Sequence, residues 1–389
     1  MTQLHMSRRQ FVTTSTSALA SSALPGAIFA APYPDSPQSH ARTNPARVII
    51  DTDPGVDDAL ALLLAMRSPE LKIEGLTPVA GNVPLELGLP NALRMVEISA
   101  RTDIPVAAGA RVPLVRRLVT ATYAHGENGL GGAVFPEPIL SPITLPAAEF
   151  IRQTVRNHPG EVTLLTIGPL TNVATALNAD PDLASLVQGL VMMGGSLSGG
   201  NITPAAEFNI YVDPEAARIV FQSGIPVTMI GLDVTRKTSL TDEHVRQLEA
   251  GQNPVSQAAA KIARNAINHN REQGFLVGPN MHDPLAVAAF LDPSLLRFKD
   301  YYIDVETTGE LTAGETLGYS PSSGDLRRSP EMERQATERM SIRGSAPTLA
   351  STKTSSVLRD KFVPNTSVAV DVDSARFFDL LIGRLSGKR

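Results

Sequence analysis

The chain has 389 residues but no cysteine and no tryptophan, and aromatic residues make up only 5% of it. Without cysteine the protein can form no disulfide, no catalytic thiol and no zinc–thiolate centre. It also lacks an excess of positive charge. The formal net charge of −5 argues against nonspecific binding to nucleic acid, which needs a basic surface. Beyond the N-terminal region, no segment is apolar enough to be expected to cross a membrane.

The N-terminal region carries a targeting pattern. Ser7-Arg8-Arg9-Gln10-Phe11-Val12 is followed by a weakly apolar stretch, rich in Ser, Thr and Ala, that ends at Ala31. This pattern predicts a twin-arginine export signal over 1–31, and therefore a periplasmic or secreted protein. Residues 32–46 are expected to form a flexible leader. The alternative is that the first residues are a disordered tail with no targeting role.

Strands and helices are expected to alternate along the rest of the chain, from residue 47 to 389. Short β-branched or apolar runs predict strands at 47–50, 73–79, 162–167, 190–193, 227–232 and 368–372. Amphipathic or apolar periodicity predicts helices at 56–66, 170–178, 214–223, 285–290 and 374–385. The alternation predicts an α/β fold, with a single large domain and a mostly parallel, doubly wound sheet flanked by helices. Functional residues are then expected at the carboxyl ends of the strands.

One segment breaks this alternation. Residues 319–356 are rich in Ser, Thr, Pro and Arg and have no sustained periodicity. We expect a long and mobile surface insertion, because structureless loops of this length are uncommon inside a compact domain. A predicted strand and helix follow it, so the insertion interrupts one domain and does not separate two.

An acidic turn follows the first predicted strand. Asp51, Asp53, Asp57 and Asp58 lie within eight residues, between a buried strand and an amphipathic helix, where their mutual repulsion is costly. A helix N-terminus or a hard divalent cation can relieve that repulsion. Gly55 is expected to let the backbone fold tightly, so that Asp53 and Asp58 converge. The turn therefore predicts a cation site, and helix capping is the alternative.

The same spacing also resembles the acidic turn of haloacid-dehalogenase-type phosphatases. In such an enzyme the first aspartate, here Asp51, would be a nucleophile, and a lysine would follow later in a suitable context. That alternative implies dependence on Mg²⁺ and release of phosphate.

Further polar residues cluster where turns are expected. Asn82 follows a predicted strand, and His125 lies in a glycine-rich loop. Asn201, Glu207 and Asn209 lie close together in sequence, and their amide and carboxylate groups suit hydrogen bonding to sugar hydroxyls. Each of these residues could instead be a turn former or a solvated loop residue.

His282-Asp283-Pro284 opens an apolar helix. Asp283 is a candidate N-cap with Pro284 at the first helical position, which is a structural alternative to a functional role.

Together these residues resemble the inosine–uridine nucleoside hydrolase family. The resemblance rests on DTDPGVDDALALLLA, VAGN, HGENG, IGPLTN, MGG, PAAEFNIYVDPEAA and HDP, in that order. It runs from Val48 to about Gly309 and returns from Asn365 to the C-terminus. It implies an enzyme that hydrolyses the N-glycosidic bond of ribonucleosides to free base and ribose.

The resemblance also implies roles for individual residues. A Ca²⁺ ion would be held by Asp53, Asp58, Asp283 and the backbone carbonyl of Ile167. Asp53 would be the catalytic base, and His282 would protonate the base or lead a proton relay to it. His125 would also face the base. Asp51 would lie near the metal and support its ligands without binding it. The ribose hydroxyls would be held by Asp57, Asn82, Asn201, Glu207 and Asn209.

The implied partner is a small-molecule nucleoside. The pair His282–Asp283 looks like the branch that handles inosine, uridine or pyrimidine nucleosides, because the purine-specific branch typically has a tryptophan at the position of His282. Residues 111–122 give no clear family pattern, and the insertion is longer than is usual in the family. A homodimer or homotetramer is implied as well. The remaining alternatives are the phosphatase described above and a non-catalytic, calcium-bound nucleoside-binding protein.

Overall fold

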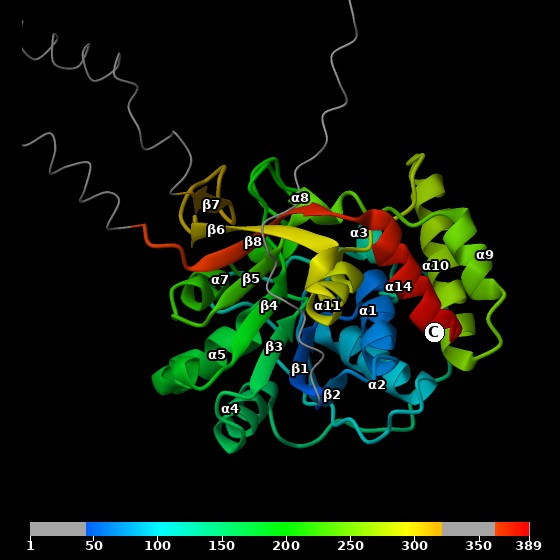
Figure 1. Cartoon of the computed structure of the whole chain (residues 1–389), viewed down its shortest axis with the longest axis horizontal. Helices are drawn as coiled ribbons and strands as arrows, with labels where there is room; N and C mark the ends of the chain where they lie inside the picture. The colour runs from blue at the N-terminus through cyan, green and yellow to red at the C-terminus, as the bar shows by residue number, and fades with distance from the viewer. Residues whose placement is uncertain (1–43, 321–361, 389) are drawn as a thin grey trace, which may run out of the picture. The chain divides into compact units, whose positions relative to one another are not determined.

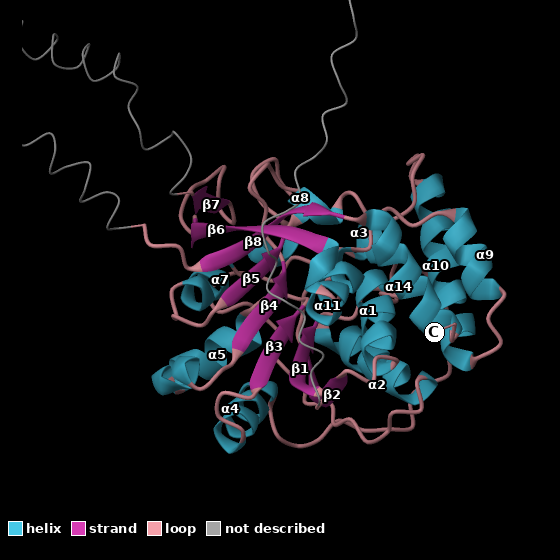
Figure 2. Ribbon diagram, viewed as in Figure 1, coloured by secondary structure: helices cyan, strands magenta, loops and turns pink. Residues whose placement is uncertain are grey.

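An eight-stranded sheet forms the centre of the computed structural model, which describes residues 44–320 and 362–388 (Figures 1 and 2). The strand order is β2-β1-β3-β4-β5-β8-β6-β7. The strands are β1 (Ala46–Thr52), β2 (Leu71–Pro78), β3 (Val162–Thr166), β4 (Gly189–Met193), β5 (Val227–Ile230), β6 (Leu296–Val305), β7 (Thr316–Tyr319) and β8 (Thr366–Val372).

The order in which the chain adds strands to the sheet reverses at β1. The chain first places β2 on one side of β1, then β3 on the other, and all of these strands are parallel, as are β4, β5 and β8. Only β6 runs antiparallel to its neighbours β8 and β7. The crevice outside the carboxyl ends of such strands, at the point of reversal, is where ligands bind in open α/β sheets. The sequence segments that follow β1, β2 and β3 therefore meet at this crevice.

Helices cover both faces of the sheet. The longer ones are α1 (Val56–Met66), α2 (Leu85–Ile98), α4 (Ala147–Asn157), α5 (Thr171–Ala179), α7 (Pro214–Phe221), α9 (Asp242–Glu249), α10 (Pro254–Glu272), α11 (His282–Leu291) and α14 (Ser374–Ser386). The shorter ones are α3 (Thr122–His125), α6 (Phe208–Val212) and α8 (Leu232–Thr235).

Two apolar cores lie between the sheet and these helices. Helices α1, α2, α10, α11 and α14 pack on one face, and α4, α5 and α7 pack on the other (Figure 1). Alternate residues of β1 serve the two cores: Val48 and Ile50 join the first, whereas Ile49 joins the second. All residues of α1 are buried, because α11 and other helices cover its outer side. The charged residues in its first turn are therefore buried with it.

The predicted fold class is confirmed. Helix α1 has the predicted bounds, and the predicted strands lie within two residues of the observed ones. Strand β5 ends at Ile230 because α8 begins at Leu232. The sequence analysis did not identify α2, α4, α9, α10, β6 or β7.

One helix start was wrongly predicted. Helix α11 begins at His282, its N-cap is Met281, and Asp283 lies within the first turn. Asp283 is therefore not an N-cap, and Pro284 is not the first helical residue.

Some predictions fall outside the described residues. The export signal over 1–31, the leader to residue 43 and the insertion from 321 onward lie there. Tyr319 itself is the last residue of β7, so the predicted start of the insertion falls inside a strand. Within 44–320 and 362–388, no helix combines the length and apolar character needed to cross a bilayer.

Candidate active site

A cavity of about 510 Å³ opens where the chain leaves the carboxyl ends of β1 to β4. It brings together residues that are far apart in the sequence. Nine of the predicted site residues line it: Asp57, Asn82, His125, Ile167, Asn201, Glu207, Asn209, His282 and Asp283. The sequence analysis thus identified nine of the residues that line the cavity.

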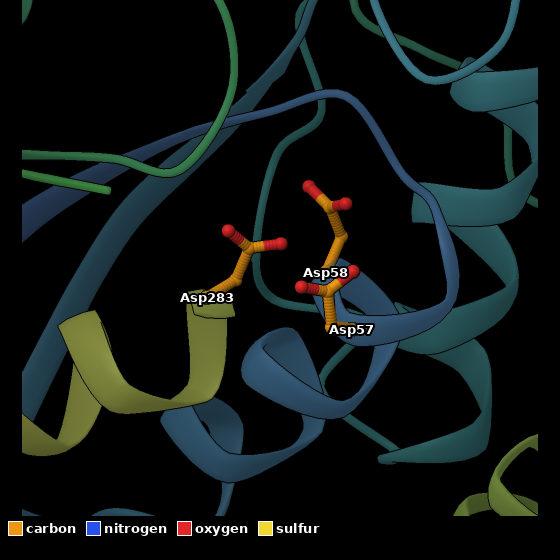
Figure 3. Close-up of side chains that lie close together, drawn as sticks. All are labelled: Asp57, Asp58 and Asp283. Atoms are coloured by element: carbon orange, nitrogen blue, oxygen red, sulfur yellow. The ribbon is translucent and has the colours of Figure 1, made fainter. Parts of the chain in front are cut away.

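Three carboxylates meet beside this cavity, and two of them, Asp57 and Asp283, line it. Asp57 and Asp58 come from the first turn of α1 and Asp283 from the first turn of α11, and each offers an oxygen within 4.8 Å of the others (Figure 3). Burial raises the pKa of Asp57 to about 6, and burial together with repulsion from the neighbouring aspartates raises that of Asp283. The positive ends of two helix dipoles face this cluster and offset only part of the repulsion. A hard divalent cation fits such a set of oxygen ligands.

The Asp58 carboxylate is held by the protein itself. Oδ1 accepts hydrogen bonds from Thr52 Oγ1 at 2.7 Å and from the Asp53 backbone N–H at 3.1 Å. Oδ2 accepts from the Gly55 N–H at 3.0 Å and from Asn82 Nδ2 at 2.9 Å. Asp58 therefore has a fixed orientation toward the cluster.

Asp53 lies beneath the cavity wall and is fully buried. Its Oδ2 accepts the Asn82 N–H at 2.7 Å, but within the described residues its buried Oδ1 has no hydrogen-bond partner. Burial and the charges of Asp58 and Asp57 raise its pKa well above the usual value. This oxygen is fully buried, has no partner among the described residues and lies near the carboxylates of three other aspartates. That combination is the strongest sign that a cation binds here.

Two glycines allow this close packing around Asp53. A Cβ at Gly81 would lie 2.1 Å from Asp53 Oδ2, and one at Gly168 would lie 2.7 Å from Oδ1. Gly55 was expected to let the backbone fold tightly, and the N–H groups of Asp53 and Gly55 both donate to Asp58. The φ of −97° and ψ of −161° at Gly55 are extended, but a Cβ there would lie 2.5 Å from His125 Nδ1. Gly55 is needed for space and not for conformation.

The observed carboxylate cluster differs in one member from the predicted metal ligands. Asp58 and Asp283 belong to both sets, whereas the third member is Asp57, which was assigned to the ribose. Asp53 is outside this set of three but is close enough to Asp58 and Asp57 for their charges to interact. The Ile167 carbonyl accepts a hydrogen bond from Asn209 Nδ2 at 3.1 Å at the cavity wall.

The opposite wall carries amides and one carboxylate. Glu207 caps α6, accepting the N–H groups of Asn209, Ile210 and Gly195 at 3.0 to 3.1 Å. Burial raises its pKa. Asn201 Oδ1 accepts the Phe208 N–H at 2.9 Å, which ties the loop before α6 to its start. These contacts fix polar groups at the cavity.

Three histidines line the cavity, and two of them, His125 and His282, have Nδ1 already engaged. His125 Nδ1 accepts the Val56 backbone N–H at 3.1 Å, and burial lowers the pKa of His125 to about 4. Its contact with Asp57, at 3.9 Å, is thus no ion pair near neutral pH. His282 Nδ1 lies 2.7 Å from Thr235 Oγ1, and burial also lowers its pKa. Both rings are therefore neutral in the ligand-free protein near pH 7.

Several cavity residues were missed by the sequence analysis. They come from the last turn of α10, the segment after it, and α3: His269, Asn270, Gln273, Phe275 and Tyr123. The start of α10 does carry a signal, since Asn253 caps it and Pro254 follows. Nothing in that signal shows that the far end of the helix, nineteen residues long, reaches the cavity.

Asp51 does not line the cavity. Its Oδ2 accepts from Thr77 Oγ1 at 2.6 Å and from Asn172 Nδ2 at 2.8 Å, so it links β1 to β2 and α5. Burial raises its pKa to about 7. A nucleophile has to reach its substrate, so this placement is incompatible with the phosphatase alternative, in which Asp51 would be the attacking group.

Comparison with known proteins agrees with this geometry. The sequence model of the family described as inosine-uridine preferring nucleoside hydrolase matches residues 48–379. The pyrimidine-specific ribonucleoside hydrolase RihA of Escherichia coli is 42% identical over 341 residues, which cover 87% of this chain and 97% of RihA.

Solved structures are similar as well. The plant nucleoside hydrolase PpNRh1 gives a TM-score of 0.74 at 32% identity, covering 88% of this chain and 99% of its own. The purine-preferring ribonucleoside hydrolase from Gardnerella vaginalis gives 0.73 at 30% identity, covering 88% and 98%.

The raised pKa of Asp51 predicts a pH-dependent stability. Asp51 has a folded-state pKa of about 7, above its usual 3.8, so its stabilising contribution is present below about pH 4 and is lost as pH rises through 7. We expect the free energy of unfolding of the metal-free protein to fall by roughly 2 kcal/mol between pH 5 and pH 8 from this group. Asp51→Asn should flatten the slope in urea titrations, whereas Asp182→Asn, at an exposed position, should not. An unchanged slope in Asp51→Asn would contradict the assignment.

Proposed function

We propose that the chain, which belongs to the inosine–uridine preferring nucleoside hydrolase family and thus hydrolyses N-ribosyl bonds, depends on calcium. We also propose that it favours pyrimidine nucleosides and inosine. The observation that carries the metal dependence is the buried, unpartnered Asp53 Oδ1 beside the cluster of Asp57, Asp58 and Asp283. By the same resemblance, the protein assembles as a homodimer or homotetramer.

Asp53, Asp58, Asp283 and the Ile167 carbonyl would hold the ion. The donor set is entirely oxygen and mostly anionic, which suits Ca²⁺. When bound, Ca²⁺ supplies positive charge that grips the ribose hydroxyls and makes a neighbouring water molecule more acidic. Asp57 lies in the same carboxylate cluster and lines the cavity, so it can accept a hydrogen bond from a ribose hydroxyl at the rim of the ion site.

Three asparagine side chains and one glutamate would bind the rest of the sugar. Asn82, Asn201, Glu207 and Asn209 line the cavity, and hydrogen bonds between their side chains and nearby backbone groups hold them in place. Such groups offer both donors and acceptors to hydroxyls. Binding energy from these fixed groups can orient C1′ toward the carboxylates, which lowers the entropic part of the barrier.

Bond cleavage then depends on negative charge below the sugar ring. As the C1′–N bond breaks, its electron pair leaves with the base and C1′ becomes oxocarbenium-like, a charge that nearby carboxylates stabilise. The oxygen of a water molecule bonds to C1′, and Asp53 takes the proton that water loses. Attack from the face opposite the base predicts inversion at the anomeric carbon.

The base would lie toward His125 and His282. Both line the cavity, and Nδ1 of each is engaged elsewhere, so Nε2 is the nitrogen free to meet the base. His282 would donate a proton to the departing base. The preference for pyrimidine nucleosides is supported by the 42% identity to an enzyme named pyrimidine-specific and by the absence of tryptophan from the chain.

The ion and Asp53 are tested together. We expect the purified protein to release reducing sugar from uridine, to lose that activity with a chelator, and to regain it with Ca²⁺. Asp53→Ala should lower turnover by about 10⁴-fold or more with the fold intact, because it removes both a ligand and the base.

Asp182→Ala, at an exposed position, is the control, and circular dichroism checks the fold of both variants. An Asp53→Ala enzyme that kept most of its activity would exclude Asp53 as base and ligand. Saturable nucleoside binding without sugar release would favour a binding protein. Mg²⁺-dependent release of phosphate from nucleotides would favour a phosphatase.

The acid role of His282 is tested by the leaving group. His282→Ala should lower kcat on uridine or inosine by roughly 10²–10⁴-fold, the usual range for general acid catalysis. It should have little effect on p-nitrophenyl riboside, whose leaving group departs without a proton. Equal losses on both substrates would argue against an acid role.

We also propose export through the twin-arginine signal, a location that suits salvage of external nucleosides. Changing both Arg8 and Arg9 to Lys should leave the protein in the cytoplasm of a host that exports the unchanged chain, as judged by fractionation and immunoblotting. Lysine at two exposed positions of the described chain, Arg67 and Arg117, serves as the control and should not alter export. Export that persists in the Arg8/Arg9 variant would contradict the signal assignment.

A further inference from the structure

A buried hydroxyl meets the histidine at the cavity. Thr235, the last residue of α8, is fully buried, and its Oγ1 lies 2.7 Å from His282 Nδ1. Within 44–320 and 362–388, this ring nitrogen is the one hydrogen-bond partner of that hydroxyl. A buried hydroxyl rarely forgoes a partner, so the contact constrains both groups.

The two segments are held together by their backbones. The Leu240 N–H donates to Pro279 O at 2.9 Å, Ser239 and Asn280 form an antiparallel bridge, and the Met281 N–H donates to Thr238 O at 2.8 Å. This short ladder, residues 238–240 against 279–281, connects the end of α8 to the start of α11. Thr235 and His282 are therefore neighbours because of backbone hydrogen bonds, and removing the hydroxyl should leave the fold intact.

A threonine hydroxyl can serve both protonation states of the ring. It donates to Nδ1 of a neutral imidazole, and after rotation it accepts from Nδ1–H of an imidazolium. In both cases the other nitrogen, Nε2, carries a hydrogen. His125 shows the same arrangement by other means, since the Val56 N–H occupies its Nδ1.

We propose that Thr235 is a positioning residue for the hydrolysis: it holds His282 so that a protonated Nε2 faces the departing base. This inference rests on the proposed function. In the reacting state the neutral ring first takes up a solvent proton at Nδ1, and the resulting imidazolium gives its Nε2 proton to the base, which has taken the electron pair of the C1′–N bond. The ring is then neutral, with its remaining hydrogen on Nδ1 donated to Thr235 Oγ1, and proton exchange with water restores the starting tautomer. Without the hydroxyl, the ring is free to turn or to carry its hydrogen on Nδ1.

Two substitutions separate the hydroxyl from the shape of the side chain. Thr235→Val keeps the volume and loses the hydroxyl, and Thr235→Ser keeps the hydroxyl. We expect Thr235→Val to lower kcat on uridine about 10-fold or more, a part of the 10²–10⁴-fold available from general acid catalysis. Activity on p-nitrophenyl riboside should stay within about 2-fold, and Thr235→Ser should stay within about 3-fold on both substrates. In the His282→Ala background, Thr235→Val should have no further effect.

A merely structural role would give a different result. Equal losses of Thr235→Val on both substrates, losses of Thr235→Ser as large as those of Thr235→Val, or no loss on uridine would each overturn the proposal. Circular dichroism and the thermal midpoint check that the variants fold.

A second readout does not depend on the reaction. Long-range ¹H–¹⁵N spectra of histidine-labelled, metal-free protein report which ring nitrogen of neutral His282 carries the hydrogen, with the signal assigned by its loss in His282→Ala. We expect hydrogen on Nε2 in the unchanged protein and a mixture of tautomers in Thr235→Val. Hydrogen on Nδ1 in the unchanged protein would overturn the positioning role. If His282→Ala affected both substrates equally, the acid role would fail, while the spectra would still decide whether Thr235 orients the ring.

Discussion

The repulsion between buried carboxylates at the end of β1 is the constraint on which this structure depends. Asp53, Asp57, Asp58 and Asp283 converge where two helices begin, and burial raises the pKa of three of them. The protein stabilises the arrangement with hydrogen bonds from Asn82 and Thr52, two helix N-termini and two glycines beside Asp53. A divalent cation is the remaining partner that this chemistry requires.

In the proposed function, the two halves of a nucleoside would take different parts of the cavity. The carboxylates proposed to face the sugar lie near strand ends and in the first turns of α1 and α11, which the core fixes. The rest of the cavity is lined by α3, the last turn of α10 and the segment after it, where Phe275 and Val277 are exposed. The sugar would thus rest on buried elements, whereas the base, next to His282, would also contact surface elements that tolerate change more easily.

Much of the site could be predicted because its residues lie in local patterns. The breakers Pro54 and Gly55 between a β-branched run and an apolar helix predicted the bounds of α1, and the carboxylates followed. Contacts between distant segments were harder. Nothing near His282 in the sequence points to Thr235, forty-seven residues earlier, because their contact depends on how α8 and α11 pack. The reason for Gly55 was also missed, since the crowding comes from His125 and Asn82.

The four hydrogen bonds to Asp58 have a consequence for how the ion comes and goes. All four donors belong to the protein, and two are backbone N–H groups of the turn itself. The ion therefore does not have to order this ligand, a step that otherwise costs about 0.5–1.5 kcal/mol for each immobilised side chain. A cation bound here would thus meet a ligand already in place, and its loss would leave these four hydrogen bonds intact, unlike in small domains that unfold without their metal.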